Sequence, residues 1–122
     1  MTPRIRALRG AITLEEDSRD QVMERTATLL QAILERNSVG RDDLVSFVFT
    51  ATGDIHSEFP AAAARAIGIS DVPLLCAREL DIEGAVPLCI RVLIHFYTEA
   101  AAADLRHVYL EGALPLRTDL PR

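Results

Sequence analysis

The run CIRVLIHFYT at residues 89–98 decides the fold. β-Branched, aliphatic and aromatic side chains fill it, and because these favour extended backbone the run predicts a strand. Side chains alternate across a strand, so one face is wholly apolar and consists of Ile90, Val92, Ile94 and Phe96. The other face mixes polar and apolar groups and consists of Cys89, Arg91, Leu93, His95 and Tyr97. We expect helices to cover the apolar face and another subunit to bury the mixed face.

Patterns on either side of this strand predict further strands over 4–14, 44–51, 72–80 and 107–110. Helices are predicted over about 18–36, 61–67 and 100–106, with Ser18 as the N-cap of the first. No linker or repeat divides the chain, so residues 1–122 are expected to form one domain. The order of elements indicates an α+β fold with a mostly antiparallel sheet and helices on one face. An irregular tail is expected over about 115–122.

Composition narrows the class of protein. The 122 residues are 49% hydrophobic and 25% charged, a globular mixture that excludes a disordered chain. The net charge of −5 argues against a nucleic-acid or membrane partner, and no apolar run approaches the roughly 18–20 residues that span a bilayer. Residues 1–10 lack the apolar core of a signal peptide, and two cysteines fit reduced thiols better than a disulfide framework. We therefore expect a soluble cytoplasmic protein.

All 13 basic residues are arginines. A coding bias toward arginine accounts for the total, and the residues expected to be solvated on a helix and a loop are Arg19, Arg25, Arg36 and Arg41. Arg9 and Arg91 differ because each lies within a predicted strand, on a face that also carries apolar residues. Two interpretations stay open for this pair: solvated residues on an open sheet face, or planar forks that bind a carboxylate or phosphate.

Signatures of the common catalytic chemistries are missing from the sequence. There is no metal-ligand spacing among His56, His95 and His107, no glycine-rich phosphate loop and no GxSxG elbow. Cys76 and Cys89 each lie in an apolar strand pattern, where a thiol is usually a small buried hydrophobe. Any reaction is therefore expected to use no metal, nucleotide or covalent attack, and to depend on electrostatics and shape.

Six short segments, taken in order, resemble one family. They are IRALRGAITLEED at 5–17, FPAAAAR at 59–65, VPLLCARELDIEG at 72–84, CIRV at 89–92, RHVYL at 106–110 and LRTDL at 116–120. Together they resemble the small chorismate mutases of the trimeric pseudo-α/β-barrel type. The resemblance implies a ferredoxin-like subunit, a homotrimer with active sites between adjacent subunits, and cofactor-free Claisen rearrangement of chorismate to prephenate on the route to Phe and Tyr.

The resemblance also implies roles for individual residues. Arg9 matches an arginine that binds a substrate carboxylate, and Arg91 matches the arginine placed at the breaking ether oxygen. Glu79 matches the carboxylate that accepts the ring hydroxyl and serves as counter-ion to Arg91. Tyr109 matches a phenol that helps to hold the side-chain carboxylate.

Further positions match the lining and rim of the family's site. They are Phe59, Ala61, Arg65, Leu74, Leu75, Cys76, Leu116 and Arg117, with Cys76 expected beside Glu79 in the same lining. Two positions depart from the family pattern. Ala62 stands where a rim lysine is expected, so carboxylate steering is left to Arg65, and Leu75 replaces a lining threonine.

Two other functions compete with this one. A trimeric enamine/imine deaminase shares the subunit shape and interface sites, although its terminal signatures are not visible here. A small-molecule-binding regulatory domain that oligomerises through its sheet would need no carboxylate at Glu79 opposite Arg91, and it would bind chorismate without turnover.

Overall fold

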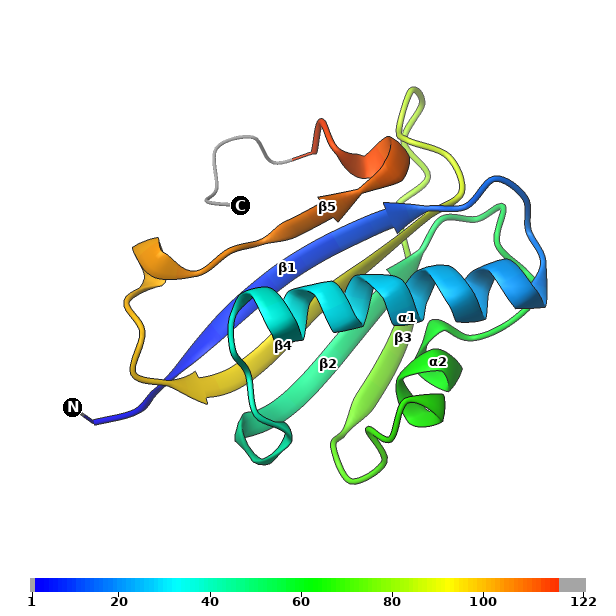
Figure 1. Cartoon of the computed structure of the whole chain (residues 1–122). Helices are drawn as coiled ribbons and strands as arrows, with labels where there is room; N and C mark the ends of the chain where they lie inside the picture. The colour runs from blue at the N-terminus through cyan, green and yellow to red at the C-terminus, as the bar shows by residue number, and fades with distance from the viewer. Residues whose placement is uncertain (1, 117–122) are drawn as a thin grey trace.

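The computed structural model describes residues 2–116. Within that part of the chain five strands form one sheet in the order β3-β2-β4-β1-β5. In chain order they are β1 (Arg4–Thr13), β2 (Leu44–Ala51), β3 (Leu74–Arg78), β4 (Cys89–Thr98) and β5 (Val108–Leu110). The helices α1 (Arg19–Arg36) and α2 (Pro60–Ala66) lie on the same face of this sheet (Figure 1). The α+β class with helices on one face is confirmed.

The strand that decides the fold, β4, is the middle of the sheet. It pairs antiparallel with β1, from Arg4 opposite Thr98 to Thr13 opposite Cys89, and antiparallel with β2 on its other side. The outer pairs, β2 with β3 and β1 with β5, are parallel. The long pairings are thus antiparallel as predicted, and the sheet as a whole is mixed. Sequence periodicity does not reveal these parallel edges, because it is the same for both directions of pairing.

The core lies between the sheet and α1. The predicted apolar face of β4 is buried throughout, and Ser18 caps α1 by accepting the Gln21 N–H at 3.2 Å, as predicted. Helix and sheet approach each other closely at Gly10, where an added Cβ would lie 2.6 Å from Cδ1 of Ile33 and 3.2 Å from Cδ1 of Leu29. None of the helices within residues 2–116 is long and apolar enough to cross a bilayer.

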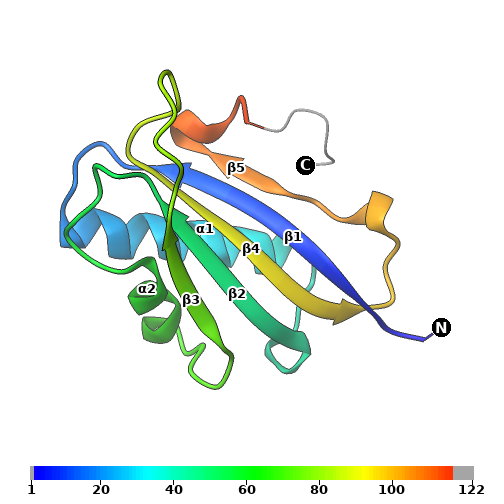
Figure 2. The same cartoon turned by 180° about the vertical axis from the view of Figure 1, so that it is seen from behind.

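Neither α1 nor α2 covers the other face of the sheet, which carries no α-helix from residues 2–116 (Figure 2). A second, smaller apolar cluster lies there, formed by Ala11, Cys89, Tyr109 and Ala113, with Val86 and Leu116 packed against it. The predicted mixed face of β4 is on this side, and its residues from Arg91 to His95 are half-buried while Tyr97 is exposed. This helix-free side, called the open face below, carries most of the polar groups of interest.

The helix predicted over 100–106 is wrong. The chain forms a single 3-10 turn there, Ala102–Asp104, and then runs extended into β5. Asn37, just after α1, accepts the Arg106 N–H through Oδ1 at 2.7 Å and donates through Nδ2 to the Arg106 carbonyl at 2.8 Å. These tertiary bonds hold the segment extended, and a helix of one or two turns is too short to compete with them. The strand predicted over 72–80 is real but shorter, Leu74–Arg78.

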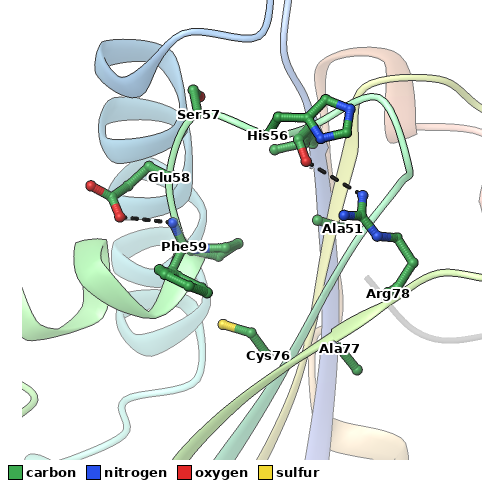
Figure 3. A pocket seen from close by; sticks show the side chains of 10 residues that line it. Ala51, His56, Ser57, Glu58, Phe59, Cys76, Ala77 and Arg78 are labelled. Carbon is green, nitrogen blue, oxygen red and sulfur yellow. Dashed lines mark hydrogen bonds between the residues drawn. The ribbon is translucent and has the colours of Figure 1, made fainter.

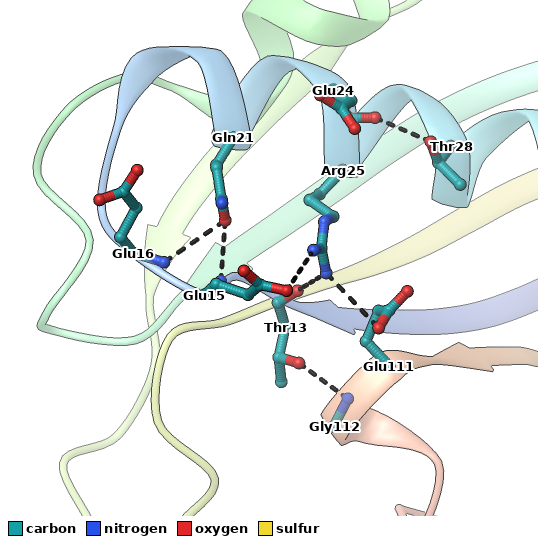
Figure 4. Close-up of polar contacts among 9 residues, drawn as sticks. All are labelled: Thr13, Glu15, Glu16, Gln21, Glu24, Arg25, Thr28, Glu111 and Gly112. Carbon is teal, nitrogen blue, oxygen red and sulfur yellow. Dashed lines mark hydrogen bonds and ion pairs between the residues drawn. The ribbon is translucent and has the colours of Figure 1, made fainter.

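Arg25 is not a solvated residue, contrary to the prediction. Its side chain is 17% exposed and donates to the Thr13 carbonyl at 3.1 Å. It also approaches the carboxylates of Glu15 at 3.3 Å and Glu111 at 3.7 Å (Figure 4). Beside it, Thr13 Oγ1 accepts the Gly112 N–H at 2.8 Å. Together these contacts fasten the segment after β5 to the end of β1.

Candidate active site

An ion pair lies on the open face at the end of β3. Glu79, the residue after that strand, places Oε1 3.0 Å from Nε of Arg91 on β4. The two side chains are 22% and 28% exposed, so water screens the pair only in part. Thr50 on β2 donates its hydroxyl hydrogen to the same Oε1 at 2.5 Å. The prediction that Glu79 is the counter-ion of Arg91 thus has a direct contact behind it.

The contact between Arg91 and Glu79 is a charge contact rather than an aligned hydrogen bond. Nε of Arg91 is buried, and its N–H makes no hydrogen bond of acceptable geometry with any described residue, although Oε1 is only 3.0 Å away. The distance between Nε and Oε1 is therefore short enough for a hydrogen bond, but the direction of the N–H is not. We take the pair as electrostatic, since Coulomb attraction depends on distance while a hydrogen bond also needs alignment.

A row of side chains crosses the open face at Arg91. Strand register places Thr50 opposite Arg91, Arg91 opposite Ala11, and Ala11 opposite Tyr109. Ala11 has the smallest side chain in this row, so only a methyl group stands on the sheet between the guanidinium of Arg91 and the phenol of Tyr109. Arg9 is opposite Leu93 on the same face, diagonal to Arg91 across β1 and β4.

The two strand arginines are held differently. The Arg9 guanidinium makes no hydrogen bond or ion pair with any residue in the range 2–116, whereas its backbone N–H donates to Nδ1 of His107 at 2.9 Å. The charge of Arg9 is therefore available to an external anion, while its backbone is fixed. Leu116 packs against the cluster that contains Tyr109, and Arg117 lies outside the described residues.

The remaining predicted residues gather at the β3 edge of the sheet. A hollow of about 330 Å³ opens between α2 and β3, and its lining consists of Phe59, Ala61, Arg65, Leu74, Leu75 and Cys76. A second hollow of about 400 Å³ adjoins it and shares Phe59 and Cys76, whose side chains face each other across the space in Figure 3. Phe59 is 67% exposed and Leu75 62% exposed, which is high for such large apolar groups.

One chain does not bring Cys76 together with the ion pair of Glu79 and Arg91. Thr50 on β2 is opposite Arg91, whereas its neighbour Phe49 is opposite Cys76. Neighbouring residues of a strand point to opposite faces, so Cys76 and Arg91 project from opposite faces of the sheet. Glu79 contacts Arg91 on the open face. The expectation that Cys76 lies beside Glu79 in one lining is therefore not met within a single chain.

The loop before α2 is tied down by carboxylates, and this fixes Phe59. Asp17 accepts the N–H groups of His56 at 2.9 Å and Ser57 at 3.1 Å. Hydrogen bonds, first from the Ser57 side chain, outweigh burial and lower the pKa of the Asp17 carboxyl. Glu58 accepts the Phe59 N–H at 2.9 Å, and this bond is the largest cause of the lowered pKa of Glu58 (Figure 3).

Asp54 ties the same loop to the start of β4. It accepts the Leu88 N–H at 2.9 Å and the Thr52 hydroxyl at 2.5 Å. Burial pushes the pKa of the Asp54 carboxyl upward, but these hydrogen bonds outweigh burial and the pKa ends below its ordinary value. Asp54 is therefore a stable anion at neutral pH that holds two loops together.

The Cys89 thiol is not activated as a nucleophile. Burial raises the pKa of the Cys89 thiol even though the Arg91 charge beside it acts in the opposite direction. Cys89 is fully buried, and Cys76 packs half-buried against the main core. Both cysteines are free thiols, as expected from their apolar strand patterns.

Sequence reasoning missed two residues that contact the predicted site. Thr50 touches Glu79 and His107 holds the backbone of Arg9. Thr50 is two residues from Val48 and alternates with the apolar Phe49 along β2, so the sequence does indicate that it faces away from the core. That it lies opposite Arg91 follows only from the register of β2 against β4, which contains an irregularity between Leu44 and Ser46.

The site as a whole offers fixed positive charge on a sheet face, one carboxylate beside it, and an apolar hollow at the sheet edge. Such a set can bind a small polyanion and stabilise negative charge that develops on it. Its polar groups require no covalent step.

Comparison with known proteins agrees with this picture. The family model described as chorismate mutase type I matches residues 5–120. Chorismate mutase AroH of Bacillus subtilis (strain 168) is 40% identical over 117 residues, 95% of this chain and 92% of that protein. AroH of Thermus thermophilus is 45% identical over 117 residues, 95% of this chain and 96% of that protein.

A solved structure extends the likeness to three dimensions. The chorismate mutase from Clostridium thermocellum superposes with a TM-score of 0.89 at 40% identity, covering 91% of this chain and 99% of that one. Neither the deaminase nor the regulatory-domain alternative is favoured by these matches. The chain belongs to the type I chorismate mutase family.

Proposed function

We propose that this protein is an isomerase that converts chorismate to prephenate without a cofactor, on the route to Phe and Tyr. The observation that carries the proposal is the half-buried guanidinium of Arg91, set in mid-sheet against the Glu79 carboxylate. Holding a half-buried charge within a sheet costs free energy, so its presence there is an argument for a functional role. The relatives that share this fold are chorismate mutases.

The chemistry explains why a guanidinium is needed. In the rearrangement a C–O bond breaks ahead of the formation of a C–C bond, so negative charge grows on the ether oxygen. A cation fixed at that oxygen binds the transition state more strongly than the ground state, and this difference lowers the barrier. Arg91 is paired with the Glu79 carboxylate, which in turn accepts a hydrogen bond from the Thr50 hydroxyl.

The other residues hold the substrate in its reactive shape. Chorismate is a dianion, and the Arg9 guanidinium, which is bound to no described residue, supplies a fork for one carboxylate. Tyr109 approaches the same group from across Ala11. Glu79 accepts the ring hydroxyl, and the exposed ring of Phe59 forms a wall. Together they favour a compact conformer in which the reacting carbons are close.

The proposed assembly is a homotrimer with each site between two subunits. Arg9, Glu79, Arg91 and Tyr109 lie on the open face, while Phe59, Arg65 and Cys76 lie at the α2–β3 edge. Packing the open face of one subunit against the α2–β3 edge of the next joins the two halves. The exposed apolar groups Ile5, Leu75 and Tyr97 support such packing. A cytoplasmic location fits the free thiols.

The rim of the proposed site lacks one cation. Ala62 on α2 supplies no charge because its side chain is a methyl group, and Arg65 is exposed on the same helix. We propose that Arg65 is the rim cation that meets a substrate carboxylate. Leu75 supplies apolar contact and no hydrogen bond.

The proposal is tested by incubating the purified protein with chorismate and following its ultraviolet absorbance. We expect the absorbance to fall far faster than in buffer alone, with prephenate as the product. Heat-denatured protein serves as the control. Decay at the uncatalysed rate, with the protein folded, would overturn the proposed activity. Binding of chorismate without turnover would instead support a regulatory domain.

A further inference from the structure

We propose that Thr50 is a positioning residue for the reaction: its hydroxyl fixes the Glu79 carboxylate so that one oxygen holds Arg91 and the other faces the substrate. The inference rests on the proposed function and adds a residue to it. Thr50 is proposed to act through Glu79 and to contact neither the substrate nor the reacting atoms.

Two contacts meet at a single carboxylate oxygen. The Thr50 hydroxyl donates to Oε1 of Glu79 at 2.5 Å, and Nε of Arg91 lies 3.0 Å from the same Oε1. Thr50 is also the cross-strand partner of Arg91 on β2 and β4. The three side chains thus form one compact unit. The second oxygen, Oε2, makes no hydrogen bond or ion pair with any residue in the described range.

The ion pair alone does not orient the carboxylate. The Arg91 N–H is not aligned for a hydrogen bond with Glu79, so the attraction fixes a distance and leaves the carboxyl group free to turn. The backbone of Glu79 is anchored by its N–H to the Ala51 carbonyl at 3.0 Å, which leaves the side-chain torsions unrestrained. Thr50 supplies the missing restraint, because a β-branched side chain in a strand has few rotamers.

This geometry divides the work of the Glu79 carboxylate. Oε1 is committed to Thr50 and Arg91, and Oε2 is left to accept the ring hydroxyl of chorismate. Without the Thr50 hydroxyl the carboxylate can turn, and Arg91 then loses its fixed position as well. Because Arg91 acts on charge that grows only in the transition state, kcat is expected to fall more than KM rises.

The first test compares Thr50→Val, which keeps the shape and removes the hydroxyl, with Thr50→Ser, which keeps the hydroxyl. We expect Thr50→Val to lower kcat about ten- to one-hundredfold, the range for losing a hydrogen bond to a charged group. Thr50→Ser should stay within about threefold of wild type, since it keeps the donor. Thr28→Val removes an exposed helical hydroxyl bonded only to the Glu24 carbonyl and serves as the matched control, with unchanged kcat.

A second test asks whether Thr50 acts through Glu79. In a Glu79→Ala background, Thr50→Val should lower kcat no further, because the group it positions is already gone. A merely structural role would lower kcat by the same factor in both backgrounds. Thr50→Ala replaces Thr50→Val if the latter fails to fold, with the same expected loss.

The inference is overturned by wild-type kcat in Thr50→Val, by equal losses in the Ser and Val variants, or by an undiminished effect in the Glu79→Ala background. Absence of turnover by the wild-type protein would overturn the proposed function instead. In that event a crystal structure of Thr50→Val decides: we expect the Glu79 carboxylate to turn away from Arg91, and an unchanged carboxylate would overturn the role of Thr50.

Discussion

At the scale of single residues, Arg91 stands out because Glu79 is the one residue within 2–116 that forms an ion pair with it. The Glu79 carboxylate forms an ion pair with Nε of Arg91, and the Thr50 hydroxyl donates a hydrogen bond to the same carboxylate. The planar fork of a guanidinium can hold such a partner and still present donors to a second acceptor, which a point charge on a flexible stem cannot do. The proposed catalysis therefore depends on the shape of the cation as well as on its charge.

Arg91→Lys tests this directly. The variant keeps the charge and loses the fork, so we expect kcat to fall about one-hundred- to one-thousandfold, the usual effect of removing a preorganised donor. The measurement is the initial rate at saturating chorismate, with thermal unfolding as the check on folding. A kcat close to wild type would contradict the electrostatic role given to Arg91.

Cys76→Ser is expected to be mild. The thiol lines the hollow beside Phe59 and packs half-buried against the core, and the proposed reaction has no covalent step. We predict a change in kcat/KM within about fivefold, the size of losing a few apolar contacts. Steady-state kinetics provide the measurement. Stoichiometric inactivation of the wild type by a thiol reagent, unprevented by chorismate, would argue for a covalent role.

At the scale of elements, the close contact of α1 with β1 depends on the absence of a side chain at Gly10. An added Cβ at Gly10 would lie 2.6 Å from Ile33 and 3.0 Å from the Val108 carbonyl. The carbonyl belongs to backbone and cannot yield as a flexible side chain can. Gly10 therefore allows α1, β1 and β5 to meet, and β1 is the strand that carries Arg9.

Gly10→Ala is predicted to lower the free energy of unfolding by about 1–3 kcal/mol, the cost of overpacking a dense core. Urea denaturation measures it. Gly53→Ala is the matched control, because the nearest atom to its added Cβ, Nη1 of Arg78, is 4.0 Å away. Equal stability of Gly10→Ala and wild type would contradict the close packing described.

The loop between β2 and α2 makes stability depend on pH. The pKa of Asp54 is lowered in the folded protein, because hydrogen bonds from Thr52 and Leu88 outweigh the opposing effect of burial. A carboxyl whose pKa is lower when folded stabilises the fold fully above its unfolded pKa of about 4. That stabilisation is lost as the pH falls through the lowered folded value.

We therefore predict that the free energy of unfolding decreases as the pH is lowered from 6 to 3, and decreases less steeply in Asp54→Asn. The variant is less stable at neutral pH, since an amide nitrogen cannot accept the hydrogen bond that the second carboxylate oxygen accepts. Urea denaturation at several pH values gives both quantities. An identical slope in variant and wild type would show that Asp54 does not contribute.

The sequence predicts elements better than it predicts their neighbours. The alternation along β4 identifies both faces, because it depends only on the order of neighbouring side chains in the strand. The segment 100–106 is mispredicted because Asn37, far away in the chain, holds Arg106 extended. Arg25 is mispredicted for a similar reason, since Thr13 and Glu111 reach it only in the folded chain.

For the candidate site, too, the sequence predicts which residues belong to it better than it predicts which of them lie together. A resemblance of short segments names Arg9, Glu79, Arg91 and Tyr109, and strand register brings them to one face. The resemblance does not reveal that Cys76 lies on the other face, because that follows from Phe49 and Thr50 being neighbours on β2. The sequence does not predict a role for Thr50 for the same reason, because a threonine in a strand indicates no function until its cross-strand partner is known.

At the scale of the whole molecule, the central feature is that Arg91 and Cys76, which belong to different halves of the proposed site, project from opposite faces of one sheet. The open-face half holds Arg91, and the edge half holds Phe59. A chain whose own halves face apart can complete a site only with another copy, and a ring of copies completes every site. We therefore expect the proposed function to depend on assembly.

Mixing two inactive variants tests this claim most directly. Arg91→Ala removes the open-face half, and Phe59→Asp places a repelling carboxylate on the edge half at an exposed position. The variants carry different tags, are refolded together, and the mixed trimers are isolated. In any mixed ring of three, one interface joins two intact halves, so we predict about one third of wild-type activity. Mixed trimers as inactive as either variant alone would contradict a site shared between subunits.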